Sequence, residues 1–216
     1  MVTVTEAVDA SPAPEPDRWY AQQQLIGSKV RLVPLAIEHA PGFLEALWAD
    51  DGGQDVYRWL GRPAPRTLAQ AKVEIYAALA ARANGNRLPF AQLDAVTGEF
   101  VGTTSYYEVS PASRSLGIGH TWLGRPWWRS GHNTESKLLL LCHAFDELGA
   151  ARVVWHTDVL NERSRAAIQR LGASMEGVLR KHRIRSDGSW RDTVQFAMID
   201  DDWPVARQRL RAALDR

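Results

Sequence analysis

The stretch from Thr121 to Gly149 constrains the fold of this chain more than any other. A strand ending at Leu123 leads through a turn, Gly124 to His132, into an apolar segment. Apolar residues recur in that segment at helical spacing: Leu138, Leu141, Phe145 and Leu148. Because a glycine after the last periodic residue is typical of a helix end, the pattern predicts a strand, a turn and a helix that ends at Gly149.

The turn before this helix has the properties of an anion site. It is basic, with Arg125 and Arg129, and it contains one flexible residue, Gly131. Asn133 or Thr134 can cap the helix, whose first N–H groups lack helical acceptors and lie at the positive end of the dipole. The competing interpretation is a glycine-bearing turn that only connects two elements. A nucleotide P-loop is excluded because no Gly-Lys-Ser/Thr follows, and a Rossmann turn would need three glycines.

Composition indicates one globular domain with a tail. The 216 residues are 45% hydrophobic and 24% charged, enough to bury a sizeable core. Residues 1–17 are rich in proline, alanine and acid and predict a mobile N-terminal tail, which leaves 18–216 as a single domain. The net charge of +1 gives no support for binding to nucleic acid.

The chemistry of the chain favours a cytoplasmic protein. The lone Cys142 cannot form a disulfide framework, and its place in the apolar helix predicts a small buried side chain. No apolar run approaches the length that spans a bilayer, so no membrane association is expected. No His, Cys and carboxylate spacing predicts a metal site.

Periodicity predicts a sheet with several helices. Strands are expected over 29–35, 90–95, 100–107, 116–123, 152–158, 175–185 and 191–199. Helices are expected over 37–49, 68–83, 133–148, 161–171 and 203–214. The order of strand, helix, strand and helix through the middle of the chain predicts a parallel pair at the centre of the sheet.

Strand 116–123 contains two glycines that alternation places together. One face is expected to carry Leu116, Ile118, His120 and Trp122, and the other Gly117, Gly119 and Thr121. Two glycines on one face leave space beside the strand. Glycine in a strand often marks a bulge or the close approach of a ligand.

Several motifs resemble those of the GNAT superfamily of N-acetyltransferases. The signature of its acetyl-CoA-binding turn is Gln/Arg-x-x-Gly-x-Gly/Ala, and the window here runs from Trp128 to Asn133, with a strict match at Gly131 alone. More specific are Asn161-x-x-Ser164 opening a helix that ends Leu171-Gly172-Ala173, then Glu176-Gly177-Val178-Leu179-Arg180 and Arg191-Asp192-Thr193-Val194. These look like the branch of bacterial ribosomal-protein alanine and serine N-terminal acetyltransferases, over about 29–204.

The resemblance implies both fold and activity. The fold would be α+β, with a mixed, mainly antiparallel central sheet flanked by helices on both faces. The activity would be transfer of an acetyl group from acetyl-CoA to a primary amine, either a protein N-terminus or a small molecule, by direct attack in a ternary complex. The alternative is a non-catalytic acyl-CoA-binding regulatory module, because the glutamate that relatives often carry in the core strand is Gly117 here. A homodimer is also implied.

The resemblance further implies how acetyl-CoA would be held. Pantetheine would lie where the strand ending Trp122-Leu123 splays from the strand that begins at Val153. Asn161 would hydrogen-bond the pantetheine arm. Pyrophosphate would meet the backbone amides of Arg129, Ser130, Gly131, His132, Asn133 and Thr134.

Candidate catalytic residues follow in part from the resemblance. Ser164 matches the position that protonates the leaving thiolate, and the competing interpretation is an ordinary helix serine. His120 has the pKa range of a general base, yet alternation puts it opposite Gly117 unless a bulge intervenes, and a packed strand histidine is the competing interpretation. His156 and Asp158 are further options for the base.

The acceptor side carries two aromatic candidates. In the superfamily the two early helices and their connector form one wall of the acceptor cleft. Tyr57 and Trp59 lie in that connector and are candidates for gripping the substrate. Packing beneath the loop is an equally good interpretation of both.

Overall fold

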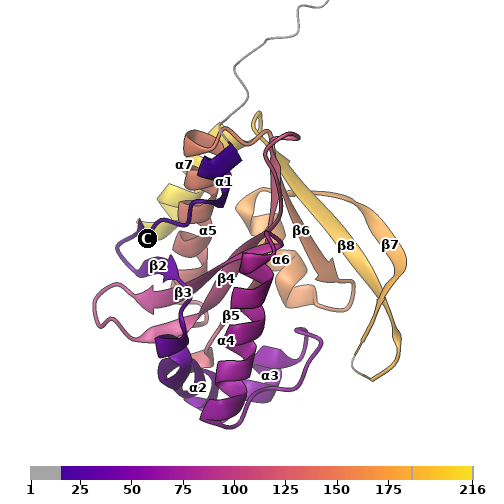
Figure 1. The fold of residues 1–216 in the computed structure, drawn as a ribbon. Coiled ribbons are helices and arrows are strands. Elements are labelled where there is room, and N and C mark those ends of the chain that lie inside the picture. Colours follow the sequence, from indigo (N-terminus) through magenta and orange to yellow (C-terminus); the bar gives the residue numbers. More distant parts are fainter. Residues whose placement is uncertain (1–15, 186, 216) are drawn as a thin grey trace, which may run out of the picture.

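The strands form one eight-stranded sheet in the order β1-β2-β3-β4-β5-β6-β8-β7 (Figure 1). The computed structural model describes residues 16–185 and 187–215. The strands are β1 (Leu25–Ile26), β2 (Val30–Pro34), β3 (Arg87–Asp94), β4 (Phe100–Ser110), β5 (Ser115–Leu123), β6 (Arg152–Asp158), β7 (Ser174–Ile184) and β8 (Trp190–Ile199). Among the described pairs only β5 and β6 are parallel, which confirms the mixed, mainly antiparallel sheet and its central parallel pair.

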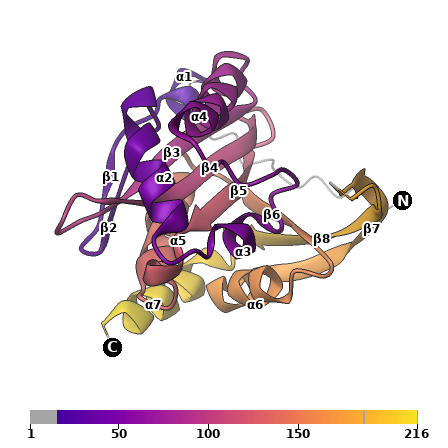
Figure 2. The same ribbon diagram turned by 90° about the horizontal axis from the view of Figure 1, so that it is seen from below.

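Helices cover both faces of the sheet. They are α1 (Pro16–Tyr20), α2 (Ala40–Trp48), α3 (Gly53–Tyr57), α4 (Leu68–Ala83), α5 (His132–Cys142), α6 (Glu162–Leu171) and α7 (Trp203–Leu214), with 3-10 turns at Ile37–His39 and Arg125–Trp127. A π-helical segment, His143–Glu147, continues α5. Figure 2 shows α2 and α4 on one side of the sheet and α5 and α7 on the other.

Two hydrophobic clusters fill the space between the sheet and these helices. Side chains from α5, α6 and α7 pack in one cluster, and those from α2, α3 and α4 pack in the other. We call the two sides of the sheet the α5 face and the α4 face. None of the helices in the described part of the chain is long and apolar enough to cross a membrane.

Capping residues set several helix ends where the sequence predicts them. The Thr67 hydroxyl accepts a hydrogen bond from the Gln70 amide at 3.2 Å and begins α4. The Asn161 side chain begins α6 in the same way, and Gly172, with φ 105°, ends it. The predicted mobile tail, 1–17, lies mostly outside the described part of the chain, which begins at residue 16. Its last two residues, Pro16 and Asp17, belong to α1.

A buried carboxylate that the sequence did not reveal ties α5 to the turn between β1 and β2. Glu135 accepts hydrogen bonds from the Ser28 hydroxyl at 2.7 Å and from the Lys29 and Val30 amides at 2.6 and 2.7 Å. Burial alone would raise the pKa of Glu135, but these donors outweigh it and lower the pKa. The first turn of α5 is therefore fixed to the edge of the sheet.

Candidate active site

The two parallel strands at the centre of the sheet separate partway along their length. β5 pairs with β6 at Ser115, Leu116 and Gly117, and the described pairing ends there. β5 nevertheless continues to Leu123, and β6 remains paired with β8 as far as Asp158. The expected splay is confirmed, and it leaves the β6 side of the outer half of β5 without a strand partner.

At the open end of this split, the Trp122 and Leu123 side chains are buried. The Trp122 ring packs edge-on against Phe43 at 4.8 Å between ring centres. The Leu123 carbonyl accepts a hydrogen bond from the Trp128 indole at 2.8 Å. The Trp122 carbonyl likewise accepts a hydrogen bond from the Gln92 side chain at 3.2 Å, so both carbonyls have partners within the protein. The pairing of this backbone with pantetheine stays a prediction.

The turn that follows β5 delivers free amides to the start of α5. Arg129 and Gly131 both have left-handed backbones, with φ 61° and 89°. The first helical bond runs from the Glu135 amide to the Gly131 carbonyl at 2.9 Å, so the amides at 132–134 precede it. The expected cap by Asn133 or Thr134 is wrong, because the left-handed Gly131 is itself the N-cap and no side chain bonds there.

His132 fixes the shape of this turn with its side chain. Its Nε2 lies 2.9 Å from Asp94 Oδ2 at the end of β3, and its Nδ1 lies 2.7 Å from the Ser130 hydroxyl. Ser130 in turn donates to the Trp127 carbonyl at 2.5 Å. Hydrogen bonds from the Thr97 amide and from His132 lower the pKa of Asp94 to about 2. The turn is thus held in shape by its own side chains while its amides stay available.

A β-bulge overturns the predicted alternation in β5. The register shifts between Thr103, opposite Trp122, and Ser105, opposite Gly119, and His120 takes φ 50°. Thr121 consequently turns to the α5 face, where its hydroxyl accepts a hydrogen bond from the buried Lys137 ammonium at 2.8 Å. The grouping of His120 with Leu116 and Ile118 is therefore wrong, because both of those lie in the core of the α5 face.

The space beside the two glycines is filled by Tyr107 of β4. A Cβ on Gly117 would lie 2.5 Å from the Tyr107 ring, and one on Gly119 would lie 2.8 Å from it. The His120 ring meets the same tyrosine edge-on at 5.8 Å. The interpretation of this space as a ligand approach is thus corrected, because a side chain of the protein occupies it.

The role of His120 as a general base stays a prediction, and its surroundings weigh against it. Desolvation, followed by the positive charge of Arg87, lowers the pKa of His120 to about 3. His120 is nevertheless exposed to solvent, so water reduces both the desolvation and the effect of the guanidinium charge, and the lowering of its pKa is smaller than burial alone would give. The direction of this shift favours a neutral imidazole that is a weaker base than a free histidine.

Replacing His120 by asparagine should therefore leave the rate of acetyl transfer within about threefold of wild type, because an imidazole of such low basicity contributes little as a base. Steady-state kinetics at pH 7 measures this. A drop of a hundredfold or more, with an unchanged KM for acetyl-CoA, would restore His120 as the base.

The start of α6 lies at the other side of the split, directly after β6. Asn161 Oδ1 accepts a hydrogen bond from the Ser164 amide at 3.1 Å, which leaves the Asn161 NH₂ group for other partners. Both residues are partly exposed. The guanidinium of Arg163 lies 3.8 Å from the centre of the Trp128 ring. This stack joins α6 to the turn that precedes α5, so the two candidate binding segments are neighbours.

The two aromatic candidates on the acceptor side have different surroundings. Tyr57 is 2% exposed and lies in the core beneath α2 and α4, with its ring 6.1 Å from that of Trp122. Its hydroxyl has no hydrogen-bond partner among the described residues, and desolvation raises its pKa. Trp59 is partly exposed beneath the Arg58 guanidinium. The burial of Tyr57 fits the packing interpretation. Trp59 remains a candidate for contact with an acceptor.

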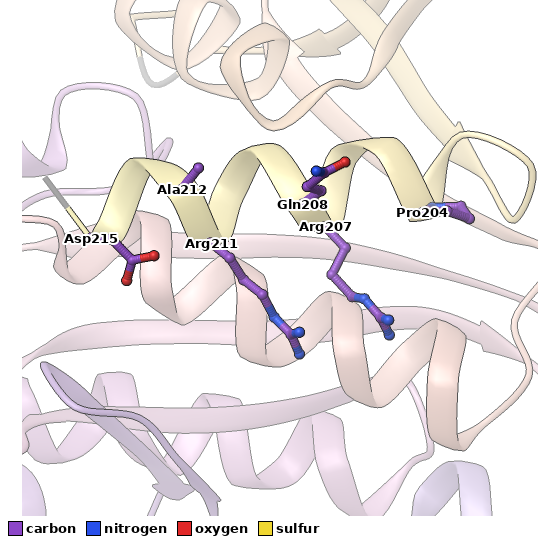
Figure 3. A pocket seen from close by; sticks show the side chains of 6 residues that line it. All are labelled: Pro204, Arg207, Gln208, Arg211, Ala212 and Asp215. Atoms are coloured by element: carbon purple, nitrogen blue, oxygen red, sulfur yellow. The ribbon is translucent and has the colours of Figure 1, made fainter.

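A shallow pocket elsewhere on the surface is lined by α7 and by Asp215, which follows it. Figure 3 shows Arg207 and Arg211 pointing to the same side of this helix. The remaining lining residues are Pro204, Gln208, Ala212 and Asp215. Arg207 pairs with Asp146 at 2.9 Å. The pocket shares no residue with the split strands or the turn.

Comparison with known proteins agrees with this geometry. Residues 29–174 match the family model described as "Acetyltransferase (GNAT) domain". A curated relative, "Putative ribosomal N-acetyltransferase YdaF" of Bacillus subtilis, is 29% identical over 106 residues. That match takes in 49% of this chain and 57% of the relative, so the chain spans little more than half of that protein's length.

Solved structures are similar over most of the chain. A GCN5-related N-acetyltransferase from Brucella melitensis has a TM-score of 0.84 and 28% identity, covering 94% of this chain and 87% of that one. Mycobacterium smegmatis RimJ in complex with CoA-disulfide has a TM-score of 0.74 and 25% identity, covering 91% and 96%. The sheet order, the split and the uncapped helix thus occur in a fold shared with acetyltransferases.

Proposed function

Because the chain belongs to the GNAT family of acetyltransferases, we propose that it moves an acetyl group from acetyl-CoA to a primary amine by direct attack in a ternary complex. The observation that carries this proposal is the split between β5 and β6 beside an uncapped helix start. Free amides and a positive helix end suit a pyrophosphate. An unpaired strand edge suits an amide-bearing chain such as pantetheine.

Different residues of this chain hold different parts of the cofactor. The backbone amides from Arg129 to Thr134 hold the pyrophosphate, and the backbone around Trp122 and Leu123 pairs with the pantetheine arm. The NH₂ group of Asn161 remains free to donate to an acceptor on that arm. Acetyl-CoA supplies a thioester whose carbonyl is polarised by backbone donors when it is bound.

The proposed acceptor is a primary amine on a protein N-terminus or on a small molecule. The name of YdaF, a putative ribosomal N-acetyltransferase, favours an amine on a ribosomal protein, although it describes that protein. We also propose a cytoplasmic location, which the single free Cys142 supports.

A panel of amines tests the proposal. Thiol release from acetyl-CoA is measured with peptides that begin with alanine or serine, with polyamines and with aminoglycosides, and the acetylated product is identified by mass spectrometry. We expect release that depends on the acceptor. A protein that binds acetyl-CoA by calorimetry but shows no acceptor-dependent release across the panel would be a binding module instead.

A further inference from the structure

A series of hydrogen-bonded side chains runs from the surface of the sheet to the split between β5 and β6. Arg152 holds the Glu176 carboxylate with both of its terminal nitrogens. Glu176 accepts a hydrogen bond from the Gln195 amide nitrogen at 3.0 Å, and Gln195 Oε1 lies 3.1 Å from His156 Nε2. His156 Nδ1 lies 2.9 Å from the Tyr107 hydroxyl.

The hydrogen bonds in this series determine which atom is the donor and which the acceptor at each step. A carboxylate only accepts, so Glu176 orients the NH₂ group of Gln195 toward itself and the Gln195 oxygen toward His156. His156 must then donate from Nε2, which leaves the lone pair on Nδ1. Tyr107 therefore donates its O–H to His156, and its oxygen can accept a hydrogen bond from another donor.

Tyr107 is the last side chain of this series and lies across the split. The tyrosine belongs to β4, its ring lies over Gly117 and Gly119 of β5, and its hydroxyl reaches His156 on β6. Gly117 is the last residue at which β5 and β6 pair. The ring thus crosses β5 where the strands begin to part, and it fills the space beside both glycines.

The neighbouring Tyr106 also lies beside a histidine, but this second tyrosine–histidine pair is buried in the core. Tyr106 points to the α5 face, is 1% exposed, and donates to the Leu140 carbonyl at 2.6 Å. It also lies near a histidine, with His143 Nδ1 at 3.2 Å. Tyr106 is sealed in the core, whereas Tyr107 is partly exposed. Two adjacent tyrosines of β4 therefore offer a test residue and a control with the same chemistry.

We propose that Tyr107 and His156 form the proton relay that deprotonates the acceptor amine, with Tyr107 as the catalytic residue and His156 as the positioning residue that receives the proton. This rests on the proposed acetyl transfer. The acceptor arrives as an ammonium. Its N–H bond breaks as a bond forms to the Tyr107 oxygen, while the Tyr107 proton moves to His156 Nδ1. The freed lone pair attacks the thioester carbonyl, the C–S bond breaks, and the second proton lost by the nitrogen protonates the leaving thiolate. The imidazolium later releases its own proton to water.

The relay needs both of its members. Desolvation raises the pKa of Tyr107, so the phenolate is not populated at neutral pH and the phenol cannot act as a base alone. The charged and titratable groups around the pair are Glu108, Arg183 and Arg191. Two further histidines face it: the His120 ring lies 5.8 Å from that of Tyr107, and the His182 ring lies 6.1 Å from that of His156.

The test compares Tyr107→Phe and His156→Asn with Tyr106→Phe as the control. Asparagine keeps a hydrogen-bond acceptor near the Nδ1 position but cannot take a proton. At pH 7 we expect each of the first two variants to lose about 100-fold in kcat with an unchanged KM for acetyl-CoA. The double variant should be no slower than either single one, because the two act as a unit. Tyr106→Phe should stay within threefold of wild type.

A pH series separates a relay from a structural role. With a peptide acceptor, whose α-amine has a pKa of about 8, the deficit of Tyr107→Phe should shrink to a few-fold above pH 9, because the amine is then already neutral. A deficit independent of pH, or a Tyr107→Phe variant as fast as wild type, overturns the relay while the acetyl transfer stands.

A second measurement does not depend on activity. Nitrogen NMR of the wild-type protein should report His156 as the Nε2–H tautomer, and the Nδ1–H tautomer would overturn the relay. A wild-type enzyme that acetylates no amine removes the proposed function whatever the tautomer, so the two failures are distinguishable.

Discussion

Replacing Ser164 by alanine is expected to lower kcat by about 10²–10⁴-fold, the usual contribution of a general acid. A hydroxyl beside the sulfur stabilises the thiolate only as negative charge develops, so the affinity for acetyl-CoA should be nearly unchanged. The residue lies in the first turn of α6, partly exposed, with its amide already bonded to Asn161. Rapid-mixing kinetics under conditions where chemistry limits the rate, combined with calorimetry of acetyl-CoA binding, measures both effects.

The Asn161→Ala variant provides the contrast. It removes a contact proposed for the bound ground state, so acetyl-CoA should bind more weakly as well as react more slowly. Loss of the cap also costs about 1 kcal/mol of stability, which a thermal melt measures separately.

Should Ser164→Ala keep near-normal turnover, the thiolate takes its proton from water or from Tyr107. Tyr106 is excluded from that role because its hydroxyl is buried against the Leu140 carbonyl.

Replacing Lys137 by methionine is expected to stabilise the protein by on the order of 3 kcal/mol at pH 7. Lys137 is 5% exposed, and its ammonium donates to the Thr104 and Thr121 hydroxyls at 2.8 Å. None of the ion pairs among the described residues includes it. Burial lowers the pKa of Lys137 from 10.5 to about 7, and each pKa unit corresponds to about 1.4 kcal/mol. Methionine has a similar length, and the two threonine hydroxyls already bond to each other at 2.9 Å.

The sign of the pH dependence comes from proton binding. Between about pH 7 and 10.5 the unfolded chain keeps the Lys137 proton and the folded chain has lost it, so the stability of the wild type rises with pH through this window. Below pH 7 both states hold the proton and the cost of the buried charge is complete. The stability gap between Lys137→Met and wild type should therefore be widest near pH 6 and narrow toward pH 10.

Denaturant unfolding at several pH values measures this gap. Lys72→Met is the matched control, because Lys72 is exposed on α4 and should show neither the stabilisation nor the pH dependence. A Lys137→Met protein less stable than wild type at pH 6 would mean that the charged amine stabilises the bulge more than its burial costs.

The sequence predicted those elements whose ends are set by neighbouring residues. β6, α4 and α7 fall within a residue of the ranges expected, because caps, glycines and periodicity act over a few positions. The parallel central pair followed from the order of elements, since parallel strands need a crossover. The family resemblance supplied the mixed sheet that the structure has.

The candidate site was harder to predict because its geometry depends on contacts between distant residues. The Thr121 hydroxyl, next to the bulge at His120, bonds to Lys137 of α5, 16 residues further along the chain, so alternation within β5 could not reveal this arrangement. The Tyr107 ring over Gly117 is a contact between two strands. One signal was present in the sequence: two glycines two residues apart in a strand imply that something large lies above them, and only the structure identifies it.

The contact between Gly117 and Tyr107 also limits how this enzyme can vary. Any side chain at 117 would meet the tyrosine ring at 2.5 Å, so it excludes the present Tyr107–His156 hydrogen bond. Positions 107 and 117 must therefore change together in evolution. A homologue that keeps the tyrosine in this rotamer retains glycine at 117. A homologue with a carboxylate at 117 needs a smaller side chain at 107 or a tyrosine in another rotamer. Such a pair is a covariation that aligned homologues would reveal without any assay.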